Sequence, residues 1–223
     1  MKIYSGPLCI YGHACRIVMQ EKTIEHEIVY AKPGEMAEHL AELNPYGETP
    51  ILQDRDLVLY GASLINEYLD ERLPHPPLMP IDPVGRGKAR LVIADIHRDW
   101  LSNVQRSIDL CTKLDKKTTD SIRDGLTGMA IQLEGKKYVL GEEFTLVDCY
   151  VGPLLWRLPM FNLKLPKQAK RLEDYGNRIF ARPSFAKSLS EPRRSSVAFN
   201  CFDGRQRARR CFGFRIWKRI TSV

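Results

Sequence analysis

The stretch Leu69–Pro80, LDERLPHPPLMP, separates two unlike halves of this 223-residue chain. It places four prolines and His75 within seven positions, directly after a segment with helical periodicity. Each proline fixes its own φ, lacks an N–H group and restricts the residue before it, so the helix ends there and the segment is stiff. The residues on either side decide whether this stretch is only a spacer or also displays His75 to a partner.

The residues before this stretch alternate strand and helix signals. We predict strands at 2–5 and 27–30, helices near 11–22 and 36–43, and a hairpin formed by 50–53 and 57–60. A further helix over 62–72 carries Leu64, Ile65, Tyr68 and Leu69 on one stripe, which we expect to be buried. This order predicts a small α/β domain, a sheet covered by helices, over residues 1–73.

Strand signals almost vanish after the proline-rich linker, which we assign to residues 74–84. Leu91, Trp100 and Val104 belong to a long segment with helical spacing, and a second helix is expected near 118–134. Thr145 and Asp148 form a variant of the capping box and predict the start of another helix. We therefore predict an all-helical domain over residues 85–192.

The net charge of +7 is concentrated at the end of the chain. Residues 193–223 hold nine lysines and arginines and a single acid, a net charge of +8, which leaves −1 for residues 1–192. The charge distribution therefore does not support a basic body that binds nucleic acid. For the basic tail three interpretations stay open: a disordered segment, a terminus produced by a reading-frame change, or direct nucleic-acid contact, which we favour least.

Several features favour a cytoplasmic protein. No apolar run approaches the roughly 20 residues needed to span a bilayer, and the first residues lack the apolar core of a signal peptide. The six cysteines show no zinc-type spacing and are too sparse for a disulfide framework. The histidines are scattered as well, so we expect no metal site and no membrane partner.

The chain resembles the glutathione transferase fold, in which a thioredoxin-like α/β domain precedes an all-α domain. The superfamily signals are the strand–turn–helix start, Thr49-Pro50 before the hairpin, the Thr145–Asp148 cap, and ARPSF at 181–185. Two more specific motifs, PHPPLMP at 74–80 and the segment Phe144–Pro159, are similar to the stringent starvation protein A family of bacterial RNA polymerase-associated proteins. The resemblance extends over about residues 1–190.

This resemblance implies a non-enzymatic transcription regulator without a cofactor. It would bind RNA polymerase holoenzyme and its primary sigma factor, and so change promoter use under starvation or stress. The contact surface would be Pro74, His75, Pro76 and Pro77. The chain would also pair with itself as a homodimer or with a paralogous subunit.

The resemblance also implies where glutathione would bind in an active relative. It would lie over the start of the first helix near Cys9, with its backbone paired to Thr49 ahead of a cis Pro50. A carboxylate and a hydroxyl at the start of the third helix would hold its γ-glutamyl end. Those positions are Gly61 and Ala62 here, and neither side chain can donate or accept a hydrogen bond. We therefore expect the site to be vestigial.

Cys9 carries the alternative function, a glutathione-dependent transferase or monothiol reductase. It occupies the first position of a thioredoxin-type Cys-x-x-Cys motif whose second cysteine is replaced by Gly12. A predicted helix N-terminus lowers the pKa of a thiol, because backbone amides and the helix dipole favour the thiolate. Cys15, one turn further along, is expected to face the core.

Overall fold

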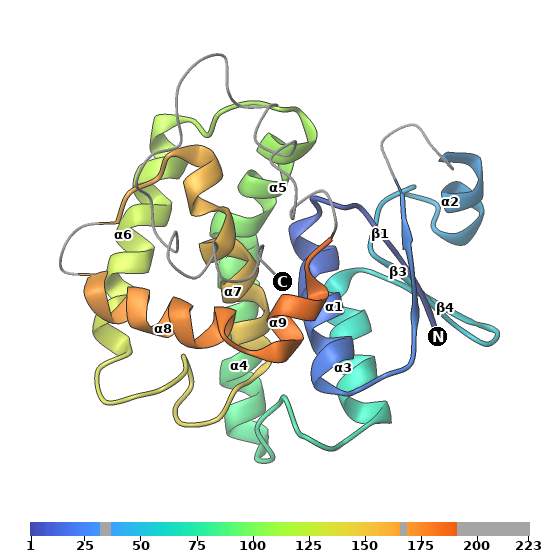
Figure 1. Ribbon diagram of the computed structural model, residues 1–223, viewed down its shortest axis with the longest axis horizontal. Coiled ribbons are helices and arrows are strands. Elements are labelled where there is room, and N and C mark those ends of the chain that lie inside the picture. Colours follow the sequence, from blue (N-terminus) through green and yellow to red (C-terminus); the bar gives the residue numbers. More distant parts are fainter. Residues whose placement is uncertain (32–36, 166–168, 191–223) are drawn as a thin grey trace.

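The computed structural model describes residues 1–31, 37–165 and 169–190, and it contains an α/β half and a helical half (Figure 1). The α/β half consists of β1 (Lys2–Ser5), α1 (Ile10–Glu21), β2 (Glu27–Tyr30), α2 (Ala37–Leu43), β3 (Ile51–Asp54), β4 (Leu57–Tyr60) and α3 (Ala62–Arg72). The helical half consists of α4 (Pro83–Ile96), the π-helix η1 (His97–Leu101), α5 (Ser102–Asp109), α6 (Lys116–Gln132), α7 (Leu146–Arg157), the 3₁₀-helix η2 (Leu158–Phe161), α8 (Lys170–Phe180) and α9 (Pro183–Ser188). The interpretations of the basic tail concern residues outside the described ranges.

The sheet has the strand order β2-β1-β3-β4. Strand β1 pairs in parallel with β2 and antiparallel with β3, and β3 forms the hairpin with β4. Ile3 of β1 stands opposite both Ile28 of β2 and Leu52 of β3, so its side chain occupies the middle of the sheet. The predicted α/β half followed by a helical half is confirmed, with the order of strands and helices as expected.

Helix α1 lies between the sheet and the helical half (Figure 1). It packs against α3 on one side and against α7 and α9 on the other. Ile17, Val18 and Met19 are fully buried there. Each such side chain contributes about 1.5–3 kcal/mol relative to leaving it exposed. The two halves consequently share one hydrophobic core rather than two separate ones.

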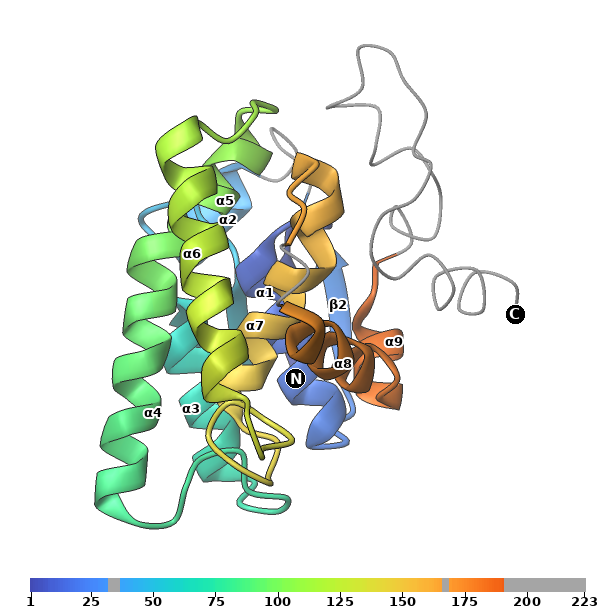
Figure 2. The same ribbon diagram turned by 90° about the vertical axis from the view of Figure 1, so that its left-hand side faces the viewer.

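Helix α7 runs through the middle of the helical half and is almost entirely buried (Figure 2). The predicted capping box at its start is confirmed, since Thr145 donates to Asp148 Oδ2 from its backbone N at 2.8 Å and from Oγ1 at 3.0 Å. Asp148 Oδ1 also accepts bonds from the Val139 amide at 3.2 Å and the Tyr175 hydroxyl at 2.7 Å. A single carboxylate thus joins the preceding loop, α7 and α8.

Two leucines that we placed on helical stripes lie on the surface. Leu64 of α3, which we expected to be buried, is 64% exposed, and Leu91 of α4 is 62% exposed. The stripe prediction for α3 was wrong at Leu64 because no described element covers the outer faces of α3 and α4, while Ile65 and Leu69 of the same helix are fully buried.

The linker between α3 and α4 is fixed to the helical half. It turns inward at Leu78 and Met79, which are 2% and 5% exposed. The Leu146 amide at the start of α7 donates to the Leu78 carbonyl at 2.8 Å.

Along the described ranges, no helix has both the length and the apolar character needed to cross a bilayer.

Candidate functional site

Cys9 caps the N-terminus of α1. Its Sγ accepts a hydrogen bond from the Gly12 amide at 3.3 Å, and its thiol donates to the Thr49 carbonyl at 3.7 Å. The Thr49-Pro50 peptide bond is cis, as expected, and Thr49 Oγ1 accepts a bond from the Gly6 amide at 3.2 Å. The structure therefore brings Cys9, Thr49 and Pro50 together at the start of α1.

The thiol of Cys9 is not activated by this location. Burial raises its pKa, and this effect outweighs the Gly12 amide, the Arg16 and Arg157 charges and the hydrogen bond at Thr49, all of which lower the pKa. Our expectation of a lowered pKa was therefore wrong, because Cys9 is only 6% exposed and a thiolate would be poorly solvated there. Cys15 is fully buried in the core, as predicted.

The helical half supplies a side chain that blocks part of this site. Gln105 of α5 accepts a hydrogen bond from the Ile10 amide, the first of α1, at 2.7 Å. Its own amide donates to Asp109 Oδ1 at 2.7 Å. One of the donors that a bound anion or thiolate would use is thereby occupied by the protein itself. Sequence reasoning missed Gln105, since no local motif connects it with a helix 95 residues earlier.

Gly61 and Ala62 lie where the third helix begins. Gly61 has φ = 87°, a left-handed conformation that favours glycine, and it provides no side-chain cap for α3. Ala62 is 7% exposed and packs into the core. The two positions that would hold the γ-glutamyl end thus offer no polar side chain.

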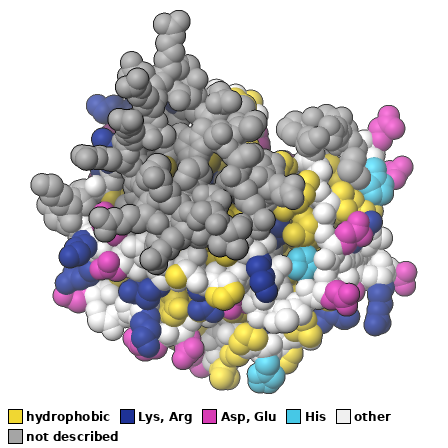
Figure 3. Space-filling model, viewed as in Figure 1, with side chains coloured by type: hydrophobic (Ala, Val, Ile, Leu, Met, Phe, Trp, Pro, Cys, Tyr) yellow, Lys and Arg dark blue, Asp and Glu magenta, His cyan; other side chains and the backbone are white. Residues whose placement is uncertain are grey.

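The Pro74–Pro77 loop is a second candidate site, on the surface. Pro74, His75, Pro76 and Pro77 are all exposed, although Leu78 directly after them is buried. The His75-Pro76 bond is cis. Hydrophobic side chains and a histidine gather at the lower edge of the molecule, where this loop runs (Figure 3).

A buried ion pair lies beneath the loop. The Lys22 Nζ and Asp70 Oδ1 atoms are 2.6 Å apart, and the two side chains are 0% and 7% exposed. Lys22 also donates to the Leu73 and Pro76 carbonyls, and Asp70 accepts from the Leu78 amide at 2.8 Å. Sequence reasoning missed both residues. Two features of the sequence could have indicated the pair: a lysine at the end of the first helix, and an aspartate just before the prolines.

Charged residues next to the loop are paired with one another. Arg72 lies 3.1 Å from Asp54, and Glu71 lies 3.0 Å from Arg86. The loop itself carries only the imidazole of His75. Its exposed face is therefore nearly neutral and consists of pyrrolidine rings around one aromatic group.

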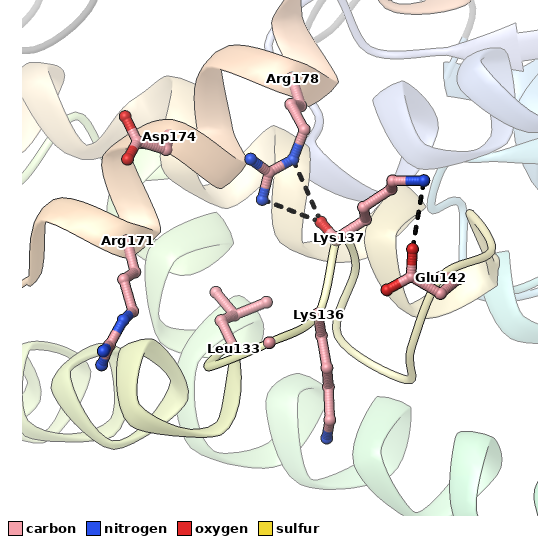
Figure 4. A pocket seen from close by; sticks show the side chains of 8 residues that line it. Leu133, Lys136, Lys137, Glu142, Arg171, Asp174 and Arg178 are labelled. Carbon is pink, nitrogen blue, oxygen red and sulfur yellow. Dashed lines mark hydrogen bonds and ion pairs between the residues drawn. The ribbon is translucent and has the colours of Figure 1, made fainter.

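A cavity of about 380 Å³ lies elsewhere, between the end of α6, the loop after it and α8 (Figure 4). Its basic side chains do not converge on one point. Arg171 pairs with Glu134 at 2.6 Å, Lys137 pairs with Glu142 at 3.1 Å, and Arg178 donates to the Lys137 carbonyl. Because three of its cations already have partners, this groove is a poor anion site.

The four histidines outside the Pro74–Pro77 loop each have a local contact. His13 is buried and bonds Ser188 at 2.9 Å, and His97 stacks on Tyr11 with ring centroids 5.0 Å apart. Across the described part of the chain, no group of three or more His, Cys, Asp or Glu residues could hold a metal ion.

The fold, an α/β domain with a thiol at the start of α1 followed by a helical domain, is that of the glutathione transferase superfamily. Residues 8–72 match the glutathione S-transferase N-terminal domain family and residues 126–183 the corresponding C-terminal domain family. The structure is similar to the Tau class glutathione S-transferase of mango, Mangifera indica, with a TM-score of 0.77 at 20% identity over 91% of this chain and 98% of that one. A Zeta-class maleyl pyruvate isomerase gives 0.74 at 23% identity, covering 85% and 97%. At such identities the likeness concerns the fold alone.

Relatives with higher sequence identity define the family more closely than the fold does. The chain is 44% identical over 196 residues to the stringent starvation protein A homolog of Coxiella burnetii, covering 86% of this chain and 92% of the relative. It is 42% identical over 193 residues to the homolog of Pasteurella multocida, covering 85% and 90%. The chain therefore belongs to the stringent starvation protein A family.

The raised pKa of Cys9 predicts slow alkylation. In the folded protein, iodoacetamide should modify Cys9 at least about tenfold more slowly than in urea-unfolded chain between about pH 7 and 9, because only the thiolate reacts. Peptide mapping by mass spectrometry at several times and pH values measures this rate. A folded-state rate near pH 7 above that of the unfolded chain would mean that the helix terminus outweighs burial.

Proposed function

We propose that this protein is a non-enzymatic, cytoplasmic transcription regulator that binds RNA polymerase holoenzyme and its primary sigma factor through the Pro74–Pro77 loop. Binding would change promoter use under starvation or stress. The observation that carries the proposal is the display of Pro74, His75, Pro76 and Pro77 on the surface above a buried ion pair. Membership of the stringent starvation protein A family supports it.

The geometry of the loop suits a contact surface. Pro74, Pro76 and Pro77 restrict the backbone before any partner arrives, so little conformational entropy is lost on binding. His75 adds an aromatic ring with hydrogen-bonding nitrogens, and the charged neighbours are paired. Such a surface fits a partner face that is apolar at its centre, the type of contact in which a few side chains carry most of the affinity.

Replacing the loop side chains tests this surface. The triple variant Pro74→Ala/His75→Ala/Pro76→Ala should recover at least about tenfold less RNA polymerase holoenzyme in a pull-down with purified components, because it removes the central contacts and frees the backbone. The readout is the amount of polymerase and sigma factor retained at fixed input.

The matched control is Lys136→Ala/Lys137→Ala/Glu142→Ala, a triple change on the surface groove of Figure 4. It should retain polymerase as the wild type does, and circular dichroism should show that both variants are folded. Equal recovery of polymerase by the loop variant and the wild type would remove the loop as the contact surface.

The alternative is a glutathione-dependent transferase or monothiol reductase using Cys9. One observation favours it: Cys9 keeps its place at the start of α1 beside the cis Thr49-Pro50 bond. Three observations oppose it, namely the raised pKa of Cys9, the bond from Ile10 to Gln105, and the absence of polar side chains at Gly61 and Ala62. We therefore propose that no cofactor is bound.

Calorimetry with glutathione separates the two functions. Millimolar glutathione should give no saturable heat, and the midpoint of thermal unfolding should move by less than about 1 °C, since a ligand that binds the native state stabilises it. An active glutathione transferase in the same buffer is the positive control. A saturable signal that disappears in Cys9→Ser would favour the alternative.

We propose further that the chain forms a homodimer through the outer faces of α3 and α4, a paralogous subunit being the other candidate for the same surface. The ion pairs Glu67–Arg90 and Glu71–Arg86 connect these two helices. Leu64 and Leu91 lie exposed on them, in positions where an amphipathic helix of a monomer would carry polar residues. Self-association about a two-fold axis would cover these side chains on both copies.

Two glutamates introduced on the outer faces of α3 and α4 should prevent dimer formation. Leu64→Glu/Leu91→Glu should sediment as the 25.6 kDa monomer, whereas the wild type should sediment at twice that mass. Ile131→Glu, which changes a similarly exposed residue of α6, is the control and should remain dimeric. A dimeric double variant would place the interface elsewhere.

A further inference from the structure

We propose that Lys22 and Asp70 are positioning residues for the Pro74–Pro77 loop, and that affinity for the partner depends on this buried pair although neither side chain reaches the surface. The inference rests on the proposed function, because it explains how the contact surface is held. Lys22 and Asp70 lie in the protein interior, yet they would affect how tightly the exposed loop binds its partner.

The contacts of the pair bracket the loop on both sides. Lys22 Nζ donates to the Leu73 carbonyl at 2.6 Å, just before the loop, and to the Pro76 carbonyl within it. Asp70 accepts from the Leu78 amide at 2.8 Å, just after it. The salt bridge between the two side chains joins these anchors into one unit.

The loop has few other means of fixing its backbone. Three of its four residues are prolines and have no N–H group, so they cannot donate to a neighbouring strand or turn. Its backbone hydrogen-bonding groups are its carbonyls and the His75 amide, and the Lys22 ammonium binds one of these carbonyls together with the Leu73 carbonyl that precedes the loop. Prolines restrict each φ angle, but the direction of the whole loop is set by these anchors.

The hydrogen-bond acceptors around Lys22 suit an ammonium group. An ammonium group has three donors, and here it meets three acceptors: Asp70 and the carbonyls of Leu73 and Pro76. A guanidinium group is planar and larger, so arginine would not reproduce this geometry in a space where the lysine side chain is fully buried. An apolar residue would leave the two carbonyls without their donor.

A purely structural role would give a different result from a positioning role. A buried ion pair contributes little net stability, and replacing both partners by apolar residues is often neutral or stabilising, whereas removing one partner is strongly destabilising. Lys22→Met therefore perturbs both stability and the loop. The double variant Lys22→Met/Asp70→Leu restores charge balance but not the hydrogen bonds to Leu73, Pro76 and Leu78.

The experiment measures the affinity of the full chain for purified RNA polymerase holoenzyme by fluorescence anisotropy, together with thermal stability. Lys22→Met and the double variant should both bind at least about tenfold more weakly than the wild type, since affinity falls with the fraction of molecules whose loop is correctly placed. The double variant should be more stable than Lys22→Met. Arg123→Ala, which breaks the exposed bond to Asp120 on α6, is the control and should bind as the wild type does.

The outcomes are distinct. Wild-type affinity in Lys22→Met, or in the double variant, overturns the positioning role. If Lys22→Met does not fold, the double variant alone decides. If Pro74→Ala/His75→Ala/Pro76→Ala binds as tightly as the wild type, the proposed contact surface itself fails, and the positioning role fails with it. Loss of binding in the loop variant with full binding in the double variant overturns the inference alone.

Discussion

The burial of α1 between the sheet and the helical half is the constraint on which the other features depend. The ends of any helix leave backbone groups without partners inside the helix, and burial removes the water that would satisfy them. At the start of α1, Gln105 accepts from the Ile10 amide, and Arg157 donates to the carbonyls of Leu8 and Cys9 at 3.1 and 3.2 Å. At its end, Lys22 reaches the linker. The Ile10 amide is therefore satisfied by a residue far away in the sequence, whereas carbonyls at the end of α1 accept from the amides of Lys22, Thr23 and Ile24.

This burial also decides the chemistry of the thiol. A charge at a helix terminus gains about 0.3–1 kcal/mol from the dipole, and up to about 2 kcal/mol in favourable geometry. Complete desolvation can shift a pKa by about 3–5 units, which is several kcal/mol. For Cys9 the second effect is larger, so its pKa is raised although the Gly12 amide and two arginines favour the thiolate. A thiol at the start of a helix can thus have a raised pKa when that helix end is buried.

The sequence predicted what depends on local patterns. The order of strands and helices along the chain, the Thr145–Asp148 cap and the cis Thr49-Pro50 bond follow from residues close together in the chain or from a strong family motif. It did not predict Gln105 at the start of α1, the Lys22–Asp70 pair, or the exposure of Leu64, because each depends on which elements meet in space. The error on the pKa of Cys9 has the same origin, since a helix terminus is visible in a sequence and its depth in the core is not.

The Lys22–Asp70 ion pair connects the core with the loop, although charged groups are costly to bury. A well-packed apolar pair at these positions would cost less desolvation and would often be at least as stable. An ion pair has an advantage only where its hydrogen bonds fix something that packing cannot, and a chain of prolines is such a case. Prolines offer carbonyls but no amides, so a donor must be brought to them from elsewhere. Lys22 is that donor, and three of the four residues in the loop it binds have no backbone N–H group. The prolines restrict each φ angle of the exposed loop, and the buried pair sets the direction in which the loop points, so the contact surface depends on the core as well as on its own residues.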